Sequence, residues 1–158
     1  MRKRTRKEDV NLNRAHDFAA IKLDFETFSP GEKADIRRTA LPEDLRVRGA
    51  FYRLLPEGER PTPQWQRVIF FLPWAEHDPD APPLGAQLAT SEKSISEIRI
   101  FQLLRSENPQ DLLHLRRLLQ HIKTTLDWGA FGERLWFWGE SVKSRIVEEY
   151  FSFSRSKK

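Results

Sequence analysis

The sequence of 158 residues contains no cysteine, only seven glycines and no long apolar run. The absence of cysteine excludes disulfide scaffolds, thiolate zinc sites, iron–sulfur clusters and cysteine nucleophiles. The few glycines form neither a phosphate-binding loop nor a dinucleotide-binding fingerprint. No apolar segment approaches the roughly 20 residues that span a bilayer, which excludes an integral membrane protein. A reducing cytoplasm is the location that these absences favour.

Histidine is also scarce, and the four histidines do not have the spacing of a metal site. His114 and His121 share a helix face, but seven residues of helix separate them by about 10.5 Å. His77-Asp78 resembles the metal-binding dipeptide of helical phosphohydrolases, yet no partner histidine stands at helical spacing from it. No Gly-x-Ser-x-Gly motif marks a serine nucleophile. We therefore expect no enzyme, no metal and no cofactor, and a metal-dependent nuclease is the least favoured alternative to a binding or assembly protein.

Charge is abundant, at 32% of the residues, and it is unevenly distributed. The formal net charge is +4, from 27 lysines and arginines against 23 acidic residues. Five of the basic residues lie within residues 1–7 and three within 155–158, where there is no acid. Residues 8–154 therefore hold 19 basic against 23 acidic groups, a net charge of −4. Any contact with nucleic acid must come from local basic faces together with the two tails.

Capping residues and apolar spacing predict an all-α fold of about eight to nine helices. Ser29-Pro30-Gly31-Glu32 has the form of a capping box with proline at the first helical position. Leu112, Leu115, Leu119, Ile122 and Leu126 follow one another at alternating steps of three and four, the spacing of a buried helix face. The expected helices cover residues 11–28, 30–40, 43–55, 62–71, 84–90, 94–107 and 108–126, with two more that begin behind Asp127 and Ser141.

The proline-rich stretch 77–83 is the predicted boundary between two packed helical groups. It separates an N-terminal half, residues 14–76, from a C-terminal half, residues 84–154. Residues 1–13 and 155–158 are expected to be basic tails, the first of them disordered. The eleven phenylalanines and five tryptophans are expected to fill the core and the interfaces rather than form a base-stacking platform.

Arginines fall on the predicted helices at spacings that build basic faces. Lys33 and Arg37 are one turn apart with Arg38 beside them, and Arg116 and Lys123 lie on nearly the same side of helix 108–126. Guanidinium groups bind phosphate bidentately and stack on bases. Such contacts give salt-dependent binding that is largely independent of sequence. For each arginine, an intramolecular ion pair is the alternative interpretation.

Short motifs in a fixed order make the sequence resemble a known family. They are Asp35-Ile-Arg-Arg, Pro42-Glu-Asp-Leu-Arg, Ala50-Phe-Tyr-Arg-Leu, Leu84-Gly85 with Leu88-Ala89, Glu97-Ile-Arg-Ile-Phe-Gln-Leu-Leu-Arg105, Leu115-Arg-Arg-Leu-Leu, His121, Leu126-Asp-Trp128 and Trp136-Phe-Trp-Gly139. Across residues 34–153, apart from the variable stretch 56–83, the sequence resembles the small subunit (CasB family) of the type I-E CRISPR surveillance complex, Cascade. Each motif alone is weak, but their order and spacing together are specific.

The resemblance implies an all-α protein without catalytic activity inside an RNA-guided, DNA-targeting ribonucleoprotein of antiviral defence. The partners it implies are the large PAM-recognising subunit, the backbone subunits that coat the guide RNA, a second copy of the chain, and nucleic acid. The nucleic acid comprises guide RNA, target DNA and the displaced single strand. Guide pairing supplies sequence specificity in such complexes, so the protein needs only backbone contacts that stabilise the R-loop.

Carried over position by position, the resemblance assigns nucleic-acid binding to a set of basic residues. Those expected to face nucleic acid are Arg38, Arg99, Arg105 and Arg117, and those that match the family pattern are Arg37, Arg53 and Arg116. Arg53 could equally be a structural ion-pair residue. After Gly139 the sequence departs from the pattern, since Glu140-Ser-Val precede Lys143 and Arg145, so these last two candidates remain open.

The alternative from another class is a free-standing helical DNA-binding regulator. Such a protein needs a recognition helix in a helix-turn-helix, usually with self-dimerisation. Gln102 and Gln120 are available to read bases, but no short helical pair with a glycine turn surrounds either. Preference for one duplex sequence would distinguish the regulator from the Cascade subunit.

Overall fold

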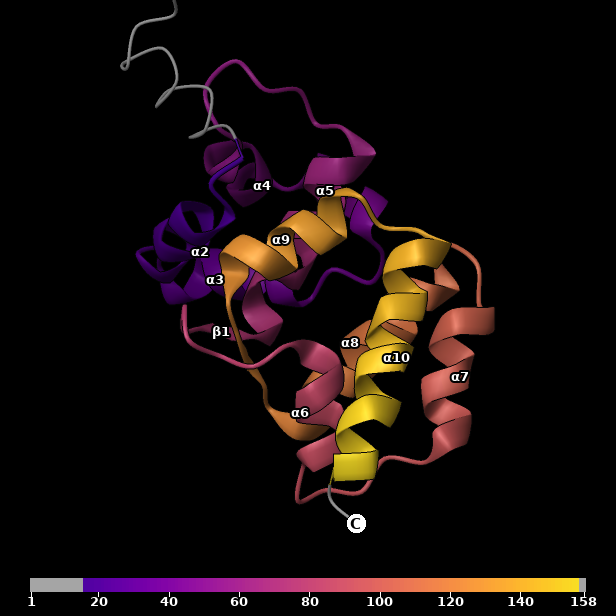
Figure 1. Cartoon of the computed structure of the whole chain (residues 1–158). Helices are drawn as coiled ribbons and strands as arrows, with labels where there is room; N and C mark the ends of the chain where they lie inside the picture. Colours follow the sequence, from indigo (N-terminus) through magenta and orange to yellow (C-terminus); the bar gives the residue numbers. More distant parts are fainter. Residues whose placement is uncertain (1–15, 157–158) are drawn as a thin grey trace, which may run out of the picture.

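The computed structural model describes residues 16–156, which form a mostly helical fold with one short pair of strands (Figure 1). The α-helices are α2 Phe18–Glu26, α3 Pro30–Arg37, α4 Gly49–Leu54, α5 Pro63–Phe71, α6 Leu84–Thr90, α7 Glu97–Arg105, α8 Gln110–Ile122, α9 Trp128–Trp136 and α10 Glu140–Ser156. Two 3-10 helices, η1 Pro42–Val47 and η2 Leu72–Trp74, and two strands, β1 Glu76–His77 and β2 Thr125–Leu126, complete the elements. The predicted all-α class is confirmed. The expected tail 1–13 and residues 157–158 lie outside the described residues. Within residues 16–156, no helix has the length and apolar character needed to cross a membrane.

Helix starts follow the capping residues of the sequence. The Ser29 hydroxyl accepts a hydrogen bond from the Glu32 N–H at 3.2 Å, and the Glu32 carboxylate accepts one from the Ser29 N–H at 3.3 Å. This capping box, predicted from the sequence, begins α3. Three predicted starts were wrong. The predicted helix 11–28 is α2, which begins at Phe18 behind Asp17, whose carboxylate accepts from the Ala20 N–H. Helix α7 begins behind Ser96, whose hydroxyl accepts from the Arg99 N–H, and α10 begins at Glu140.

The predicted helix 43–55 is wrong, because the segment divides at Arg48. Arg48 has extended backbone, with φ −116° and ψ 121°, between η1 and α4. Its guanidinium donates a hydrogen bond to Asp35 at 3.2 Å, and glycine, a weak helix former, follows it in the chain. The break therefore allows η1 to pack on α5 while α4 packs on α3.

The predicted helix 108–126 is too long, because α8 ends at Ile122. Lys123 adopts the left-handed conformation, with φ 49° and ψ 65°, and the chain leaves the helix there. Thr125 and Leu126 then form β2, which pairs in parallel with β1 so that Glu76 lies opposite Thr125 and His77 opposite Leu126. This strand pair was not predicted. Leu126 is still buried, as its place in the leucine stripe indicated, but on a strand.

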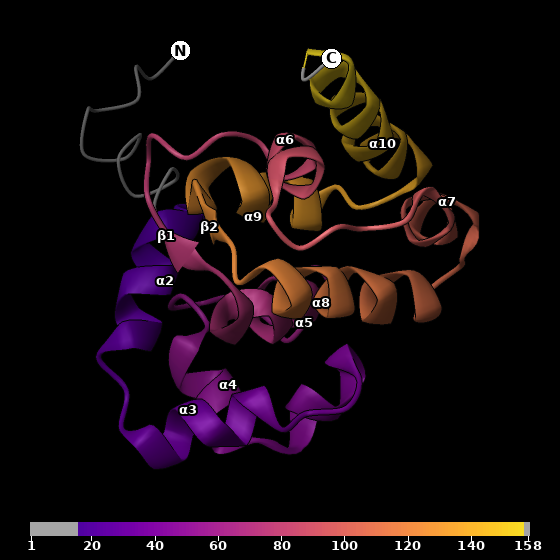
Figure 2. The same cartoon turned by 90° about the horizontal axis from the view of Figure 1, so that it is seen from below.

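One hydrophobic cluster includes residues from both sides of the proline-rich stretch, from Phe18 on α2 to Val147 on α10. Helix α9 of the C-terminal half packs on α2 and α5 of the N-terminal half. Seen from below, α5 and α8 run through the middle, with α3 and α4 on one side and α6, α9 and α10 on the other (Figure 2). The division into two groups at residues 77–83 stays a prediction, since both sides contribute to this one core.

Helices α6 and α10 approach closely at Gly85. A Cβ atom at this position would lie 2.3 Å from the Glu149 Cβ and 2.4 Å from the Ile146 carbonyl oxygen. These distances are far below van der Waals contact, so position 85 accepts only glycine at this helix spacing. The contact fixes α10, which also packs against α7, beside the rest of the C-terminal half (Figure 1).

Candidate nucleic-acid interface

Arg116 joins α8 to the segment that follows α3. Its guanidinium donates a hydrogen bond to the Thr39 carbonyl at 2.9 Å and lies 4.9 Å from the centre of the Phe70 ring. Burial lowers the pKa of Arg116, and the neighbouring charge of Arg117 lowers it further. The side chain is half-buried and engaged inside the protein, so it positions the neighbouring arginines and is itself poorly placed for a phosphate.

Three arginines around this joint have free guanidinium groups. Arg38 precedes Thr39 and is exposed, Arg117 follows Arg116 and is exposed, and Arg99 lies half-buried on α7, which packs against α8. Within the described part of the chain, none of the three side chains makes a hydrogen bond or an ion pair. We call these three residues, together with His114 between Arg99 and Arg117, the basic strip.

The pKa of His114 responds to the charges of the basic strip. Burial lowers the pKa of its imidazole, and the positive charges of Arg117 and Arg99 lower it further, against the opposing effect of Asp111. The imidazole is therefore neutral near pH 7. Arg99 on α7 and Arg117 on α8 therefore both act on this imidazole, although they are 18 residues apart in the sequence.

Arg37 lies beside the basic strip, on an aromatic ring. Its guanidinium carbon is 4.5 Å from the centre of the Trp74 ring, and that of Arg116 is 5.9 Å from the same ring. A surface hollow of about 490 Å³ opens here between the end of α3, η2, β1 and the end of α8. We call it the Trp74 hollow; its lining includes Arg37, Trp74, Glu76, Leu119, Gln120 and Lys123. No local pattern of residues predicts this hollow, because its walls come from three segments that are distant in the chain.

Lys143 is turned into the protein, which corrects its place among the surface candidates. The residue is only 7% exposed, and its ammonium group donates to the Ser106 carbonyl at 2.8 Å and to the Asp111 carboxylate at 3.1 Å. The Trp138 indole N–H donates to the same carboxylate oxygen at 2.9 Å. Lys143 therefore neutralises a buried acid and does not lie on a basic face.

The remaining candidates are dispersed. Arg53 donates to the Glu32 carboxylate at 2.9 Å, the ion pair that was the alternative interpretation of this residue. Hydrogen bonds from Ser29, together with Arg53, lower the pKa of Glu32. Arg105 is exposed, with its guanidinium 6.0 Å from the Phe101 ring. Arg145 is exposed on α10 and lines a separate hollow beside Phe137.

The histidine considered as a metal ligand has a backbone partner. His77 Nδ1 accepts a hydrogen bond from the Trp128 N–H at 3.1 Å, directly after the strand pair. Residues 16–156 contain no group of three or more histidine, aspartate or glutamate side chains that could hold a metal ion.

Known proteins resemble this chain in both sequence and structure. Residues 32–151 match the family model of the CRISPR-associated protein Cse2. The chain is 32% identical over 148 residues to the CRISPR system Cascade subunit CasB of Escherichia coli strain K12, a match that covers 85% of this chain and 92% of the relative. A chain in the crystal structure of E. coli Cascade bound to a PAM-containing double-stranded DNA target matches with a TM-score of 0.78 and 33% identity. That match covers 87% of this chain and 97% of the other.

Proposed function

Because the chain belongs to the CRISPR-associated Cse2 family, we propose that it is the small, non-catalytic subunit of a type I-E Cascade complex and stabilises the R-loop. In this function it holds nucleic-acid backbone, chiefly the displaced non-target strand, without reading its sequence. Base pairing with the guide RNA supplies the specificity, so the protein requires only charge and shape along a strand.

The observation that carries this proposal is the basic strip. Arg38, Arg99 and Arg117 belong to two different halves of the sequence, yet Arg116 and the packing of α7 on α8 bring them to one joint. The arginine guanidinium is a planar fork that matches phosphate, and in these three residues it has no hydrogen-bond or ion-pair partner within residues 16–156 to give up on binding. The strip therefore suits a phosphate backbone better than the ion-paired Arg53 or the buried Lys143 does.

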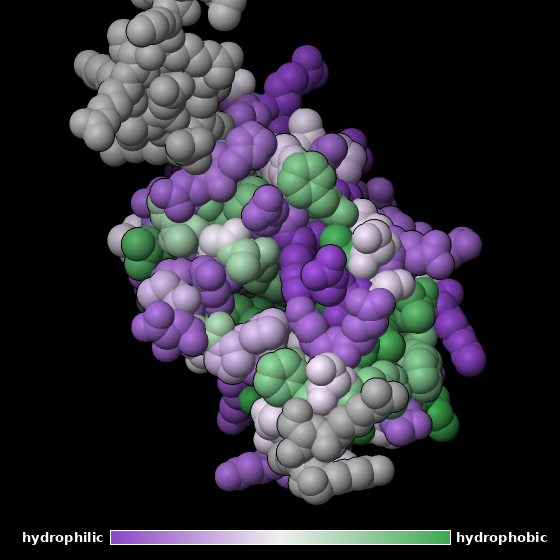
Figure 3. Space-filling view, in the orientation of Figure 1, coloured by the Kyte–Doolittle hydropathy of each residue, from purple (hydrophilic) through white to green (hydrophobic). Residues whose placement is uncertain are grey.

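Contacts with the other subunits belong to the same proposal. The expected partners are the large PAM-recognising subunit, the guide-coating backbone subunits and a second copy of this chain. Large apolar side chains are exposed at Val47 (83%), Ile98 (71%) and Phe137 (68%). Apolar surface gathers over α7 on the right of the molecule (Figure 3), the helix that carries Ile98. Exposed apolar side chains of this kind are suited to the core of a protein interface.

Reconstitution tests the proposal. The chain is added to a guide-RNA-loaded type I-E complex that lacks its small subunit, and comigration and retention of target DNA are followed separately. We expect Arg38→Glu, Arg99→Glu and Arg117→Glu to assemble normally and to release target DNA faster. The matched control is Arg60→Glu, an exposed arginine in the loop between α4 and α5, which should retain DNA normally.

Three results would contradict the proposal. If all three charge reversals retain target DNA as well as the unchanged chain at low and high salt, the basic strip is not the nucleic-acid face. If the free chain prefers one duplex sequence and does not comigrate with the complex, it is a DNA-binding regulator instead. Cleavage of DNA on addition of divalent cations would identify a nuclease.

A further inference from the structure

We propose that the Trp74 hollow binds an unpaired nucleobase of the displaced DNA strand while the basic strip holds the phosphates of that strand. This site rests on the proposed function, because the strand has to lie along the basic strip. The ligand class is a single base presented on a sugar-phosphate backbone.

A stacked pair of side chains prepares the hollow for a flat ligand. The Arg37 guanidinium lies 4.5 Å from the centre of the Trp74 ring and is exposed, while Arg116 approaches the same ring at 5.9 Å and is anchored to Thr39. Proteins that bind single strands stack bases on aromatic rings and on guanidinium planes. Arg37 and Trp74 offer both kinds of surface in one place, already ordered before the base arrives.

Polar side chains form another part of the wall of the hollow. Gln120 and Lys123 on α8 and Glu76 on β1 line the hollow and are exposed. The strand pair fixes this wall, since the Glu76 N–H donates to the Thr124 carbonyl at 3.2 Å. Amide, ammonium and carboxylate groups are the donors and acceptors that the edge of a base requires. None of their side chains makes an intramolecular hydrogen bond or ion pair within residues 16–156.

The end of α8 places Lys123 at the rim of the hollow. The residue has the left-handed conformation, with φ 49°, in which many helices end and for which glycine or asparagine is the usual residue. A glycine here would relieve the strain but would remove the ammonium group from the rim of the hollow.

The hollow and the basic strip are continuous along the chain. Arg37 of the hollow is adjacent to Arg38 of the strip, and Gln120 lies one turn after Arg117 on α8. A strand whose phosphates contact Arg38 and Arg117 therefore passes the opening of the hollow. Trp65 and Trp128 are fully buried, whereas Trp74, Trp136 and Trp138 are partly buried and pack against the core. Of these three, Trp74 lines this hollow.

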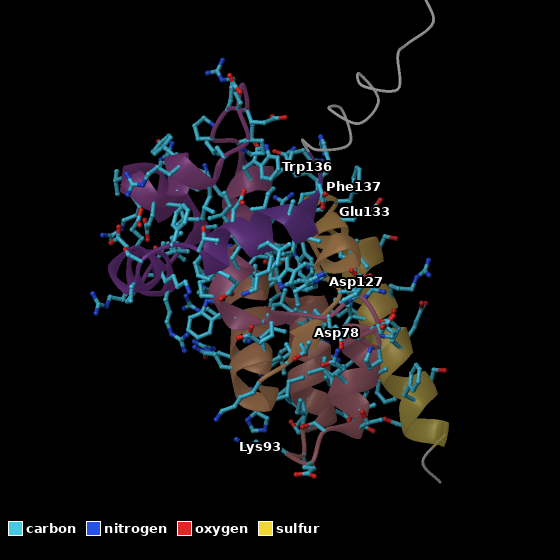
Figure 4. All side chains as sticks on the ribbon, turned by 90° about the vertical axis from the view of Figure 1, so that its left-hand side faces the viewer. Asp78, Lys93, Asp127, Glu133, Trp136 and Phe137 are labelled. Atoms are coloured by element: carbon cyan, nitrogen blue, oxygen red, sulfur yellow. The ribbon has the colours of Figure 1, made fainter. Side chains whose placement is uncertain are left out.

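Photocrosslinking in the reconstituted complex tests the site. 5-Iodouracil is placed at single positions along each DNA strand of the R-loop, and the crosslinked side chain is identified by mass spectrometry. We expect a crosslink from the displaced strand to Trp74, which disappears in Trp74→Leu. The matched control is Phe153→Leu, which removes an exposed aromatic side chain of α10. Phe137, which lies beside Trp136 and Glu133 at the end of α9 (Figure 4), is left unchanged because it belongs to the proposed subunit contacts.

An abasic scan measures the contribution of the base. At the crosslinking position, removal of the base should weaken retention at least about fivefold, the lower limit for stacking on an aromatic side chain. The same abasic substitution should have no effect in Trp74→Leu. If the abasic substitution weakens retention equally in the unchanged chain and in Trp74→Leu, Trp74 only supports Arg37 and the base site is wrong. A crosslink confined to the target strand, or no crosslink, would also overturn the site.

The two proposals fail in different ways. If the charge reversals on the basic strip release DNA but no base contacts Trp74, the proposed function stands and the base site is wrong. If the charge reversals have no effect and no crosslink forms, both are wrong.

Discussion

The Arg116 guanidinium donates a hydrogen bond to the Thr39 carbonyl at 2.9 Å, across 77 residues of sequence. Arg38 precedes the acceptor and Arg117 follows the donor, so this one bond fixes the spacing between two arginines with free guanidinium groups. The two adjacent arginines of α8 therefore differ in their contacts: Arg116 is half-buried and bonded within the protein, and Arg117 is exposed at its surface.

Arg116 and Arg117 should separate stability from binding. Arg116→Met leaves the Thr39 carbonyl without its donor and should lower the free energy of unfolding by about 1–3 kcal/mol. Arg117→Met should change it by less than about 0.5 kcal/mol but should speed the release of target DNA. Urea unfolding and target retention measure the two effects, and equal effects of the two substitutions on both would contradict the assignment.

Lys143 should behave as a core residue. Lys143→Met leaves the Asp111 carboxylate charged and short of one partner, so we expect a loss of about 3–5 kcal/mol in the free energy of unfolding. Adding Asp111→Asn removes that buried charge and should restore part of the loss. Arg145→Met, two residues further on an exposed position, is the control and should be close to neutral. A neutral Lys143→Met would show that the buried pair contributes nothing.

Acidification should weaken the fold through His114 and strengthen DNA retention. The pKa of His114 is lowered in the folded chain, so the unfolded chain takes up this proton first. The contribution of the neutral imidazole to stability is complete above the ordinary pKa of about 6.5 and declines as the pH falls below it. A phosphate between Arg99 and Arg117 offsets their charges and favours the protonated imidazole.

Unfolding and retention measured at about pH 7.5 and about pH 5.5 test this linkage, since the range brackets the ordinary histidine pKa. His114→Gln should reduce both pH dependences, and the other three histidines are present in both proteins. Unchanged pH profiles in His114→Gln would exclude the residue from the basic strip.

Lys123→Gly should raise the free energy of unfolding of the chain and weaken the retention of target DNA by the complex. Glycine tolerates the left-handed conformation that costs other residues about 1–2 kcal/mol, so unfolding should require more urea. Loss of the ammonium group at the rim of the Trp74 hollow should nevertheless speed DNA release. Lys123→Asn is the conservative control, because asparagine also tolerates this conformation. Equal retention by all three proteins would exclude Lys123 from the site.

Features that depend on neighbouring residues could be predicted from the sequence, and those that depend on distant contacts could not. The capping box at Ser29 and the buried face of Leu112, Leu115 and Leu119 are local patterns, and both are confirmed. The strand pair joins segments 49 residues apart, and its two-residue strands are too short for any periodicity.

The candidate site divides in the same way. The arginines of the basic strip were assigned through the family resemblance, and their binding role stays a prediction. The inward direction of the Lys143 side chain was missed. A signal for it existed, because Lys143 stands three and four residues before Ile146 and Val147, which are both buried. The stacking of Arg37 on Trp74 had no such signal, since it joins the ends of two separate elements.

The strand pair between Glu76–His77 and Thr125–Leu126 has a mechanical consequence. The two strands join the segment before α6 to the segment after α8. Helices α6, α7 and α8 and the prolines of residues 77–83 therefore lie in a loop whose two ends are hydrogen-bonded to each other. The Asp78 N–H, which donates to the Leu126 carbonyl at 3.0 Å, extends the fastening by one residue. A DNA strand bound as proposed to Arg99 and Arg117 would pull on α7 and α8 inside this closed loop, and α8 would pass the force to the core because its leucines are buried there.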